Sequence, residues 1–180
     1  MPILLIKYKF KLNGHRNLAD RIEYNPDRVS PIMEKGAGAS SIMNRLTFLE
    51  GEWKGEISNR DSRSRYEDIL VCRRDGDRIS CESTMYHNGE AIVHRGFDLW
   101  LEDDTVLGSW KLDGEDSGIY ECEYEAEKDE FLFNLRDYPT SVDYRTIRRI
   151  DMMHFITMEQ LPREGTSSVE TLQVEYSRTL

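Results

Sequence analysis

The sequence contains no long hydrophobic run, and its longest, Ile3–Ile6, has four residues. A helix that crosses a bilayer needs about 20 consecutive apolar residues, so the sequence predicts no such span. The run is also too short for the apolar part of a secretory signal, and Lys7 and Lys9 follow it rather than precede it. We therefore expect a cytoplasmic protein with no membrane partner.

Positive charge is also scarce, since 24 Lys and Arg stand against 34 Asp and Glu, a net charge of −10. Nucleic acids and anionic membranes attract basic surfaces, so we expect neither as a partner. The deficit of positive charge is distributed unevenly along the chain. Residues 1–43 carry seven basic and four acidic side chains, or +3, which leaves −13 for residues 44–180.

Metal-binding and catalytic motifs are missing as well. The three cysteines form no C-x-x-C pair, and the four histidines show no ligand spacing with them, so we expect no metal site. The chain contains no G-x-S-x-G, no H-E-x-x-H and no Gly-rich phosphate loop. We therefore assign no catalytic residue and expect a binding protein rather than an enzyme.

The first 43 residues do contain one strand-like segment. Ile6, Tyr8 and Phe10 alternate with lysines, which predicts a half-buried strand over residues 3–12. Turn-forming and small residues then predominate up to residue 43, which predicts a loosely structured linker with one short helix at most. We interpret residues 1–43 as an N-terminal extension.

From residue 44 onward, ten short strand-like runs alternate with turn signals such as Asp75-Gly76 and Asn88-Gly89. The runs are too closely spaced for crossover helices, so neighbouring strands are antiparallel. A meander this long exposes its edges unless it closes, which predicts an all-β, up-and-down barrel of about ten antiparallel strands over residues 44–180. The predicted strands are 52–58, 65–73, 77–87, 91–101, 105–112, 118–126, 131–137, 143–149, 152–160 and 168–178.

Pairing across the turn at Asn88-Gly89 places Glu82 opposite Arg95, which brings opposite charges together. This register points Arg95 outward. His94 and Asp98 lie on the other face of the same strand and are then expected inside the barrel.

A turn at Lys128-Asp129 places Tyr124 opposite Phe133 and gathers apolar side chains on one face of the hairpin. We expect this face to point inward. Its members are Gly118, Tyr120, Cys122, Tyr124, Phe131, Phe133 and Leu135.

Two later strands carry further polar candidates for the interior. Tyr144 and Arg148 alternate with Arg145 and Arg149, so one or two arginines are expected to enter the barrel. His154 shares a face with two apolar side chains and is also expected to point inward.

Two registers are open to Cys72 and Cys81. A turn centred on Asp75-Gly76 places each cysteine opposite an apolar residue, whereas a turn centred on Gly76-Asp77 places the cysteines opposite each other. The first turn has the favoured Asp-Gly chemistry, so we predict no disulfide.

The segment Leu46–Glu56 combines a short apolar turn with G-x-W-x-G at Gly51, Trp53 and Gly55. It resembles the entry motif of the calycin superfamily, which includes lipocalins, fatty-acid-binding proteins and nitrobindins. Nearest are bacterial lipocalin-like families related to nitrobindin, which share segments like Asp98–Trp110 and a terminal Arg, here Arg178. The resemblance implies that a short helix closes one end of the barrel and that Trp53 packs across it. We expect Arg178 to cap the Trp53 ring and both residues to be structural.

A nitrobindin would hold a ferric haem through a His on the last strand. In this sequence Glu170 or Thr171 takes the place of that His. We therefore predict no cofactor and consider haem unsupported, although His154 on the neighbouring strand offers a substitute ligand.

A hollow barrel of this kind would have an aromatic wall and a polar anchor. We expect a small hydrophobic or amphipathic ligand, and an interior arginine would favour an anionic group on it. The residues predicted to bind the ligand are His94, Tyr120, Tyr124, Phe133, Tyr144, Arg148 and His154. The alternative is a barrel filled by its own side chains.

Two other functions stay open on the sequence. The basic strand over residues 3–12 could make the chain an interaction or assembly module, by adding to its own barrel or to a neighbour's, and a homodimer is one form of this. A lyase or isomerase could use the same barrel pocket, because barrel folds host many chemistries.

Overall fold

The computed structural model describes residues 38–58, 65–137, 144–162 and 169–179, all of which belong to one compact unit, Pro31–Leu180. The predicted strand over residues 3–12 lies outside the described residues. It therefore stays a prediction, as does the division of the chain at residue 44.

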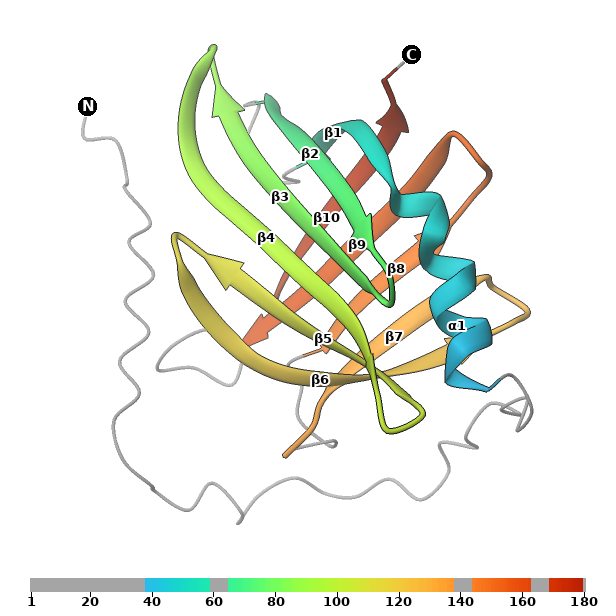
Figure 1. Cartoon of the computed structure of the whole chain (residues 1–180). Helices are drawn as coiled ribbons and strands as arrows, with labels where there is room; N and C mark the ends of the chain where they lie inside the picture. Colours follow the sequence, from blue (N-terminus) through green and yellow to red (C-terminus); the bar gives the residue numbers. More distant parts are fainter. Residues whose placement is uncertain (1–37, 59–64, 138–143, 163–168, 180) are drawn as a thin grey trace, which may run out of the picture. The chain divides into compact units, whose positions relative to one another are not determined.

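The described residues form a closed, antiparallel, ten-stranded barrel in which each strand pairs with its neighbours in sequence and β1 pairs with β10 (Figure 1). The predicted all-β fold and the ten strands are confirmed, with ends that differ from the prediction by at most three residues. The strands are β1 Gly51–Ser58, β2 Arg65–Asp75, β3 Arg78–His87, β4 Glu90–Glu102, β5 Thr105–Leu112, β6 Glu115–Glu125, β7 Glu130–Leu135, β8 Tyr144–Arg149, β9 His154–Pro162 and β10 Val169–Arg178.

Closure gives every described strand a partner on both sides. No helix in the described part of the chain has the length and apolar character needed to cross a bilayer.

A short helical segment precedes the barrel, as the resemblance implied. Helix α1, Ala39–Arg45, runs into the 3₁₀ turn η1, Leu46–Leu49, and together they bury Met43, Leu46 and Leu49. The Trp53 indole nitrogen donates to the Leu49 carbonyl at 2.7 Å, which ties this segment to the first strand. We call this part of the molecule the helix-covered end.

Aromatic packing fills the barrel at the helix-covered end. Trp53 is fully buried, and its ring meets Phe155 edge-on at 4.7 Å between centroids. Phe155 also contacts Phe48 of η1 and stacks on Tyr176. Because large aromatic side chains from the helical turn and from opposite strands interlock here, this end is a packed apolar core.

The predicted absence of a disulfide is wrong. The β2–β3 turn is centred on Gly76-Asp77, so Cys72 pairs with Cys81 across the strands, and the two sulfurs form a disulfide. Both cysteines face the interior and are buried. The observed register is shifted by two residues from the predicted one, and such a shift keeps the same side chains on the same face, so the period-two pattern does not distinguish the two turns. Cys122 is a buried free thiol.

The predicted orientation of β4 is wrong beyond its turn. Pairing starts as expected with Tyr86 opposite Ala91, but Ile92 is an extra residue that shifts the register by one. Arg95 therefore lies opposite Ser83 rather than Glu82 and faces the interior. A single bulge reverses every later inside–outside assignment on this strand, because side chains alternate with a period of two.

The inward face of the β6–β7 hairpin is predicted correctly, although its register is not. Tyr124 pairs with Phe131 and Cys122 pairs with Phe133, a shift of two residues from the predicted pairing. A shift of two keeps the same side chains on the same face. Tyr120, Phe131 and Phe133 are accordingly fully buried.

Candidate functional site

A set of ionisable and hydroxyl side chains lies on the inner wall of the barrel, next to the aromatic core. We call this set the charged layer. Six strands supply it, and its members are Asp68, Ser83, Arg95, Arg145, Glu159 and Tyr176.

Asp68 of β2 is the centre of the charged layer and is fully buried. One of its oxygens accepts a hydrogen bond from Ser83 Oγ at 2.5 Å. The other accepts from the Tyr176 hydroxyl at 2.5 Å and from Arg95 Nη2 at 2.9 Å. Three donors thus fix this carboxylate in place and satisfy its charge.

Gly55 of β1 makes the contact between Asp68 and Tyr176 possible. It pairs with Tyr176 on one side and with Asp68 on the other. A Cβ atom on Gly55 would lie 2.7 Å from Tyr176 Cε1 and 2.7 Å from Val174 Cγ1. Because Gly55 has no side chain, the Tyr176 ring crosses β1 and its hydroxyl reaches β2.

A second carboxylate lies between two arginines. Glu159 of β9 is 3.4 Å from Arg95 Nη1 and 3.5 Å from Arg145 Nε. Both guanidinium groups are buried, whereas the Glu159 side chain is 19% exposed. Arg145 also lies over the Tyr120 ring, at 5.2 Å from its centroid. The charged layer therefore holds two positive and two negative groups.

Two members of the charged layer have pKa values that are shifted from their ordinary values. Burial raises the pKa of Tyr176 well above its ordinary value, and the neighbouring Asp68 adds to this effect, so the phenol stays a donor. Burial would lower the pKa of Arg95, but its acidic neighbours outweigh burial and raise it. Arg95 Nε is buried and has no hydrogen-bond partner among the described residues.

Two of the residues predicted to bind a ligand lie together on the inner wall. Tyr120 and Phe133 are fully buried and both pack against Trp110, at 5.2 and 5.0 Å between ring centroids. Tyr124 lies apart from them, since its ring contacts Phe131 and its hydroxyl donates to Asp129 at 2.8 Å.

The inward orientation expected for two histidines is wrong. His94 is exposed on the outer face of β4, within 3.2 Å of Thr84, because the bulge reverses that strand. His154 is exposed and lies 2.9 Å from Asp151, since Phe155, not His154, faces the core. Asp98, expected inside with His94, also lies on the outer face.

The expected orientation of β8 is wrong as well. Arg145 is the arginine that enters the barrel, opposite the buried Phe133 and Glu159. Tyr144 and Arg148 occupy the alternate positions of this strand and are half-buried on its other face. Neither therefore joins the charged layer.

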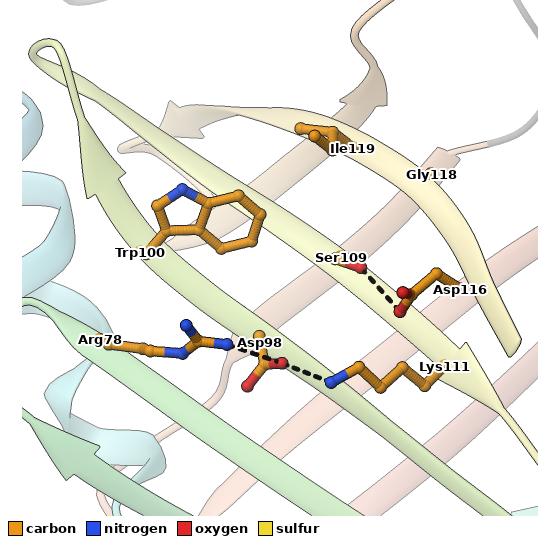
Figure 2. A pocket seen from close by; sticks show the side chains of 8 residues that line it. All are labelled: Arg78, Asp98, Trp100, Ser109, Lys111, Asp116, Gly118 and Ile119. Atoms are coloured by element: carbon orange, nitrogen blue, oxygen red, sulfur yellow. Dashed lines mark hydrogen bonds and ion pairs between the residues drawn. The ribbon is translucent and has the colours of Figure 1, made fainter. Parts of the chain in front are cut away.

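The outer face of β3–β6 carries a hollow of about 410 Å³, drawn in Figure 2. Asp98 lies at its floor and contacts Lys111 at 2.7 Å and Arg78 at 3.1 Å. Ser109 donates to Asp116 across the hollow at 3.3 Å. The charged groups drawn here engage one another, so we regard this hollow as a solvated ion-pair surface and the charged layer as the stronger candidate site.

Sequence reasoning missed most of the charged layer, yet one signal was available. Asp68 shares a strand face with Tyr66, Leu70 and Cys72, so it is a charged residue in an apolar stripe. Such a residue is buried with partners or is functional. Arg95 gave no equivalent signal, because its orientation depends on the bulge at Ile92.

The last strand, β10, offers no histidine that could hold a haem. The inner face of β10 presents Leu172, Val174 and Tyr176, and the Tyr176 hydroxyl is bonded to Asp68. His154, the substitute considered from sequence, lies on the outside. Among the described residues no group of three or more His, Cys, Asp or Glu side chains is arranged to hold a metal.

Arg178 lies against the Trp53 ring, as expected from the sequence. Its guanidinium lies over the Trp53 ring at 5.1 Å from the centroid and donates to the Glu50 carbonyl. Gly51 lies directly beneath it with φ of 129°, a conformation that favours glycine. The segment Gly51–Gly55 therefore supports the helix-covered end and, through Gly55, the charged layer.

No protein-family model and no curated protein matches the chain. Among solved structures, the crystal structure of Rv2717c from M. tuberculosis is similar, with a TM-score of 0.55 and 17% identity over 77% of this chain and 97% of that one. A structure of EF1p2_mFAP2b bound to DFHBI has a TM-score of 0.46 and 9% identity over 77% of this chain and 100% of that one. The likeness to Rv2717c supports the barrel fold alone.

Proposed function

We propose that this barrel binds a small amphipathic molecule, with its polar head at the charged layer and its apolar tail along the adjoining inner wall. The observation that carries the proposal is the charged layer itself. Four charged side chains lie on the inner wall of the barrel, two of them buried and two largely so, and Arg95 Nε has no hydrogen-bond partner among the described residues.

A buried ion network is a poor way to stabilise a fold. Removing charges from water costs several kcal/mol per ion, and well-packed apolar replacements are often neutral or stabilising. A network of this kind inside a barrel is therefore better explained by recognition of a polar group than by stability.

The side chains between the charged layer and the end opposite the helix suit an apolar tail. Tyr66, Met85, Leu135 and Leu172 are half-buried and pack against the core. Each lies on the inner face of its strand, so apolar side chains that water partly reaches line the interior on β2, β3, β7 and β10. The proposal also fits a calycin-like protein, which the segment Gly51–Gly55 and Arg178 resemble.

Isothermal titration calorimetry with dodecanol tests this function, because dodecanol is an amphipathic probe without charge. The Leu135→Trp variant adds bulk to the proposed wall, and we expect its affinity to be at least about tenfold weaker than that of the unchanged protein. Ile119→Trp, at an outer position that is 43% exposed, is the matched control and should bind normally. Absence of dodecanol binding, or equal binding by all three proteins, would contradict the proposal.

A further inference from the structure

The hollow on the outer face of the barrel has a charged half and an apolar half (Figure 2). In the charged half, Asp98 forms ion pairs with Arg78 and Lys111. The apolar half is lined by Trp100 and by Ile119, which is 43% exposed. Ion pairing accounts for the first half. Large apolar side chains that gather in a concave surface are typical of a recognition site, so the second half needs its own explanation.

Trp100 is held as a rigid aromatic surface at the edge of the hollow. It lies directly opposite Leu107 on the outer face of β4 and β5, and Leu107 is only 1% exposed. Directly opposite side chains on one face of a sheet are in contact, so the indole covers Leu107. Its nitrogen donates to Glu102 at 3.3 Å, which fixes the ring edge. The remaining ring surface borders the hollow, and we call it the Trp100 platform.

Polar groups beside the Trp100 platform keep unused hydrogen-bonding capacity. Within the described part of the chain, the Lys111 ammonium and the Arg78 guanidinium each form one ion pair, to Asp98, and their side chains are 45% and 56% exposed. One oxygen of Asp116 accepts from Ser109 at 3.3 Å, and the other accepts from no described residue. The hollow therefore offers free donors and a free acceptor side by side.

The charges in the hollow favour a neutral ligand. Two basic side chains are balanced by two acidic ones, so the hollow has no net attraction for an anion or a cation. The charge of −13 on residues 44–180 further disfavours a phosphate-bearing ligand. A sugar ring meets all the conditions. Its hydroxyls both donate and accept, and its C–H face carries weakly positive hydrogens that suit the negative face of an indole.

We infer that this hollow binds a neutral oligosaccharide, with one sugar ring on the Trp100 platform and its hydroxyls bonded to Lys111 and Asp116. The site lies outside the barrel and is independent of the proposed function. Its volume of about 410 Å³ is typical of a small-molecule site. A second hollow of about 490 Å³ also has Arg78, Asp98 and Lys111 in its lining, so a ligand longer than one ring finds room beyond the ion pairs.

Nuclear magnetic resonance of the ¹⁵N-labelled full chain tests the site with three neutral probes, cellotetraose, maltotetraose and chitotetraose. Each is added to about 10 mM, which exceeds even a weak Kd of about 1 mM. We expect at least one probe to shift the Trp100 indole N–H signal, which Trp100→Phe identifies by its loss. The signals of Trp53 and Trp110, which are buried, should stay in place. No shift with any probe, or a shift of the buried indoles alone, would overturn the inference.

Substitutions at the platform test the stacking. Trp100→Ala should bind the active probe at least about tenfold more weakly than the unchanged protein, whereas Trp100→Phe keeps a ring and should stay within about threefold. Tyr144→Ala removes another half-buried aromatic side chain, on the outer face of β8, and is the matched control. It should bind normally. Undiminished binding by Trp100→Ala, equal weakening by the control, or equal loss in the alanine and phenylalanine variants would each contradict the inference.

Two further measurements separate this site from the barrel interior. Urea unfolding shows which variants are folded, and Trp100→Phe carries the test if Trp100→Ala is not. Calorimetry with dodecanol should give the same affinity with and without the active saccharide. Displacement of the saccharide by dodecanol would place it in the barrel and overturn the outer site. Saccharide binding without dodecanol binding would instead contradict the proposed function and leave the outer site supported.

Discussion

The helix-covered end and the charged layer lie next to each other in one barrel but are built on opposite principles. The first is a packed aromatic cluster around Trp53, Phe48 and Phe155. The second places Asp68, Arg95 and neighbouring charges on the same inner wall. From this difference we expect the apolar end to carry most of the stability of the fold, and our proposed function assigns ligand recognition to the charged layer.

The largest effect is expected from Trp53→Ala, which removes the centre of the helix-covered end. The lost burial and the remaining cavity should lower the free energy of unfolding by about 3–5 kcal/mol. Urea unfolding measures this directly. Trp100→Ala, at a half-buried outer position, should cost clearly less. An equal loss of unfolding free energy in the two variants would mean that the helix-covered end contributes no more to the stability of the barrel than the outer face does.

Asp68→Ala is expected to be nearly as damaging, although for a different reason. It leaves the buried Arg95 guanidinium without its closest carboxylate, and breaking a buried pair typically costs about 3–5 kcal/mol. Replacing both members, Asp68→Leu with Arg95→Met, should recover most of that loss in urea unfolding because no charge is stranded. A double variant that is no more stable than the single one would show that the charged layer does stabilise the fold.

A smaller effect is expected from Gly55→Ala, which tests the link between the two regions. The added methyl group would meet Tyr176 and Val174 at 2.7 Å, and such overpacking costs about 1–3 kcal/mol. A crystal structure should show the Tyr176 hydroxyl displaced from Asp68. Gly38→Ala, where no atom lies within 4 Å of the added Cβ, is the control and should change stability by less than about 0.5 kcal/mol.

The smallest effect is expected on the outer face, at Asp98. Burial would raise the pKa of this carboxyl, but hydrogen bonds from Lys111 and Ser80 outweigh burial and lower it. A lowered pKa in the folded state contributes stability that is present above the ordinary pKa and is lost as the pH falls through the lowered value. Asp98→Asn should therefore cost about 1 kcal/mol near pH 7 and less below about pH 4. Urea unfolding at several pH values measures this. A difference in the free energy of unfolding between the two proteins that grows as the pH falls would contradict the prediction.

Strand number, strand order and closure could be read from the sequence because turn signals and period-two alternation are local properties. Tyr120 and Phe133 were placed correctly on the same grounds. His94 and Arg95 were exchanged between the two faces because one bulge residue, Ile92, leaves no composition signal. The Cys72–Cys81 pairing was missed for a different reason, since the two possible registers differ by two residues and place the same side chains inside.

The double variant Asp68→Leu with Arg95→Met provides the most direct test of the central claim, that the charged layer recognises a ligand head rather than holding the fold together. Calorimetry with dodecanol, on protein shown by urea unfolding to be folded, is the measurement. We predict that the variant stays folded and binds dodecanol at least about tenfold more weakly than the unchanged protein. A folded variant with unchanged affinity would contradict the account.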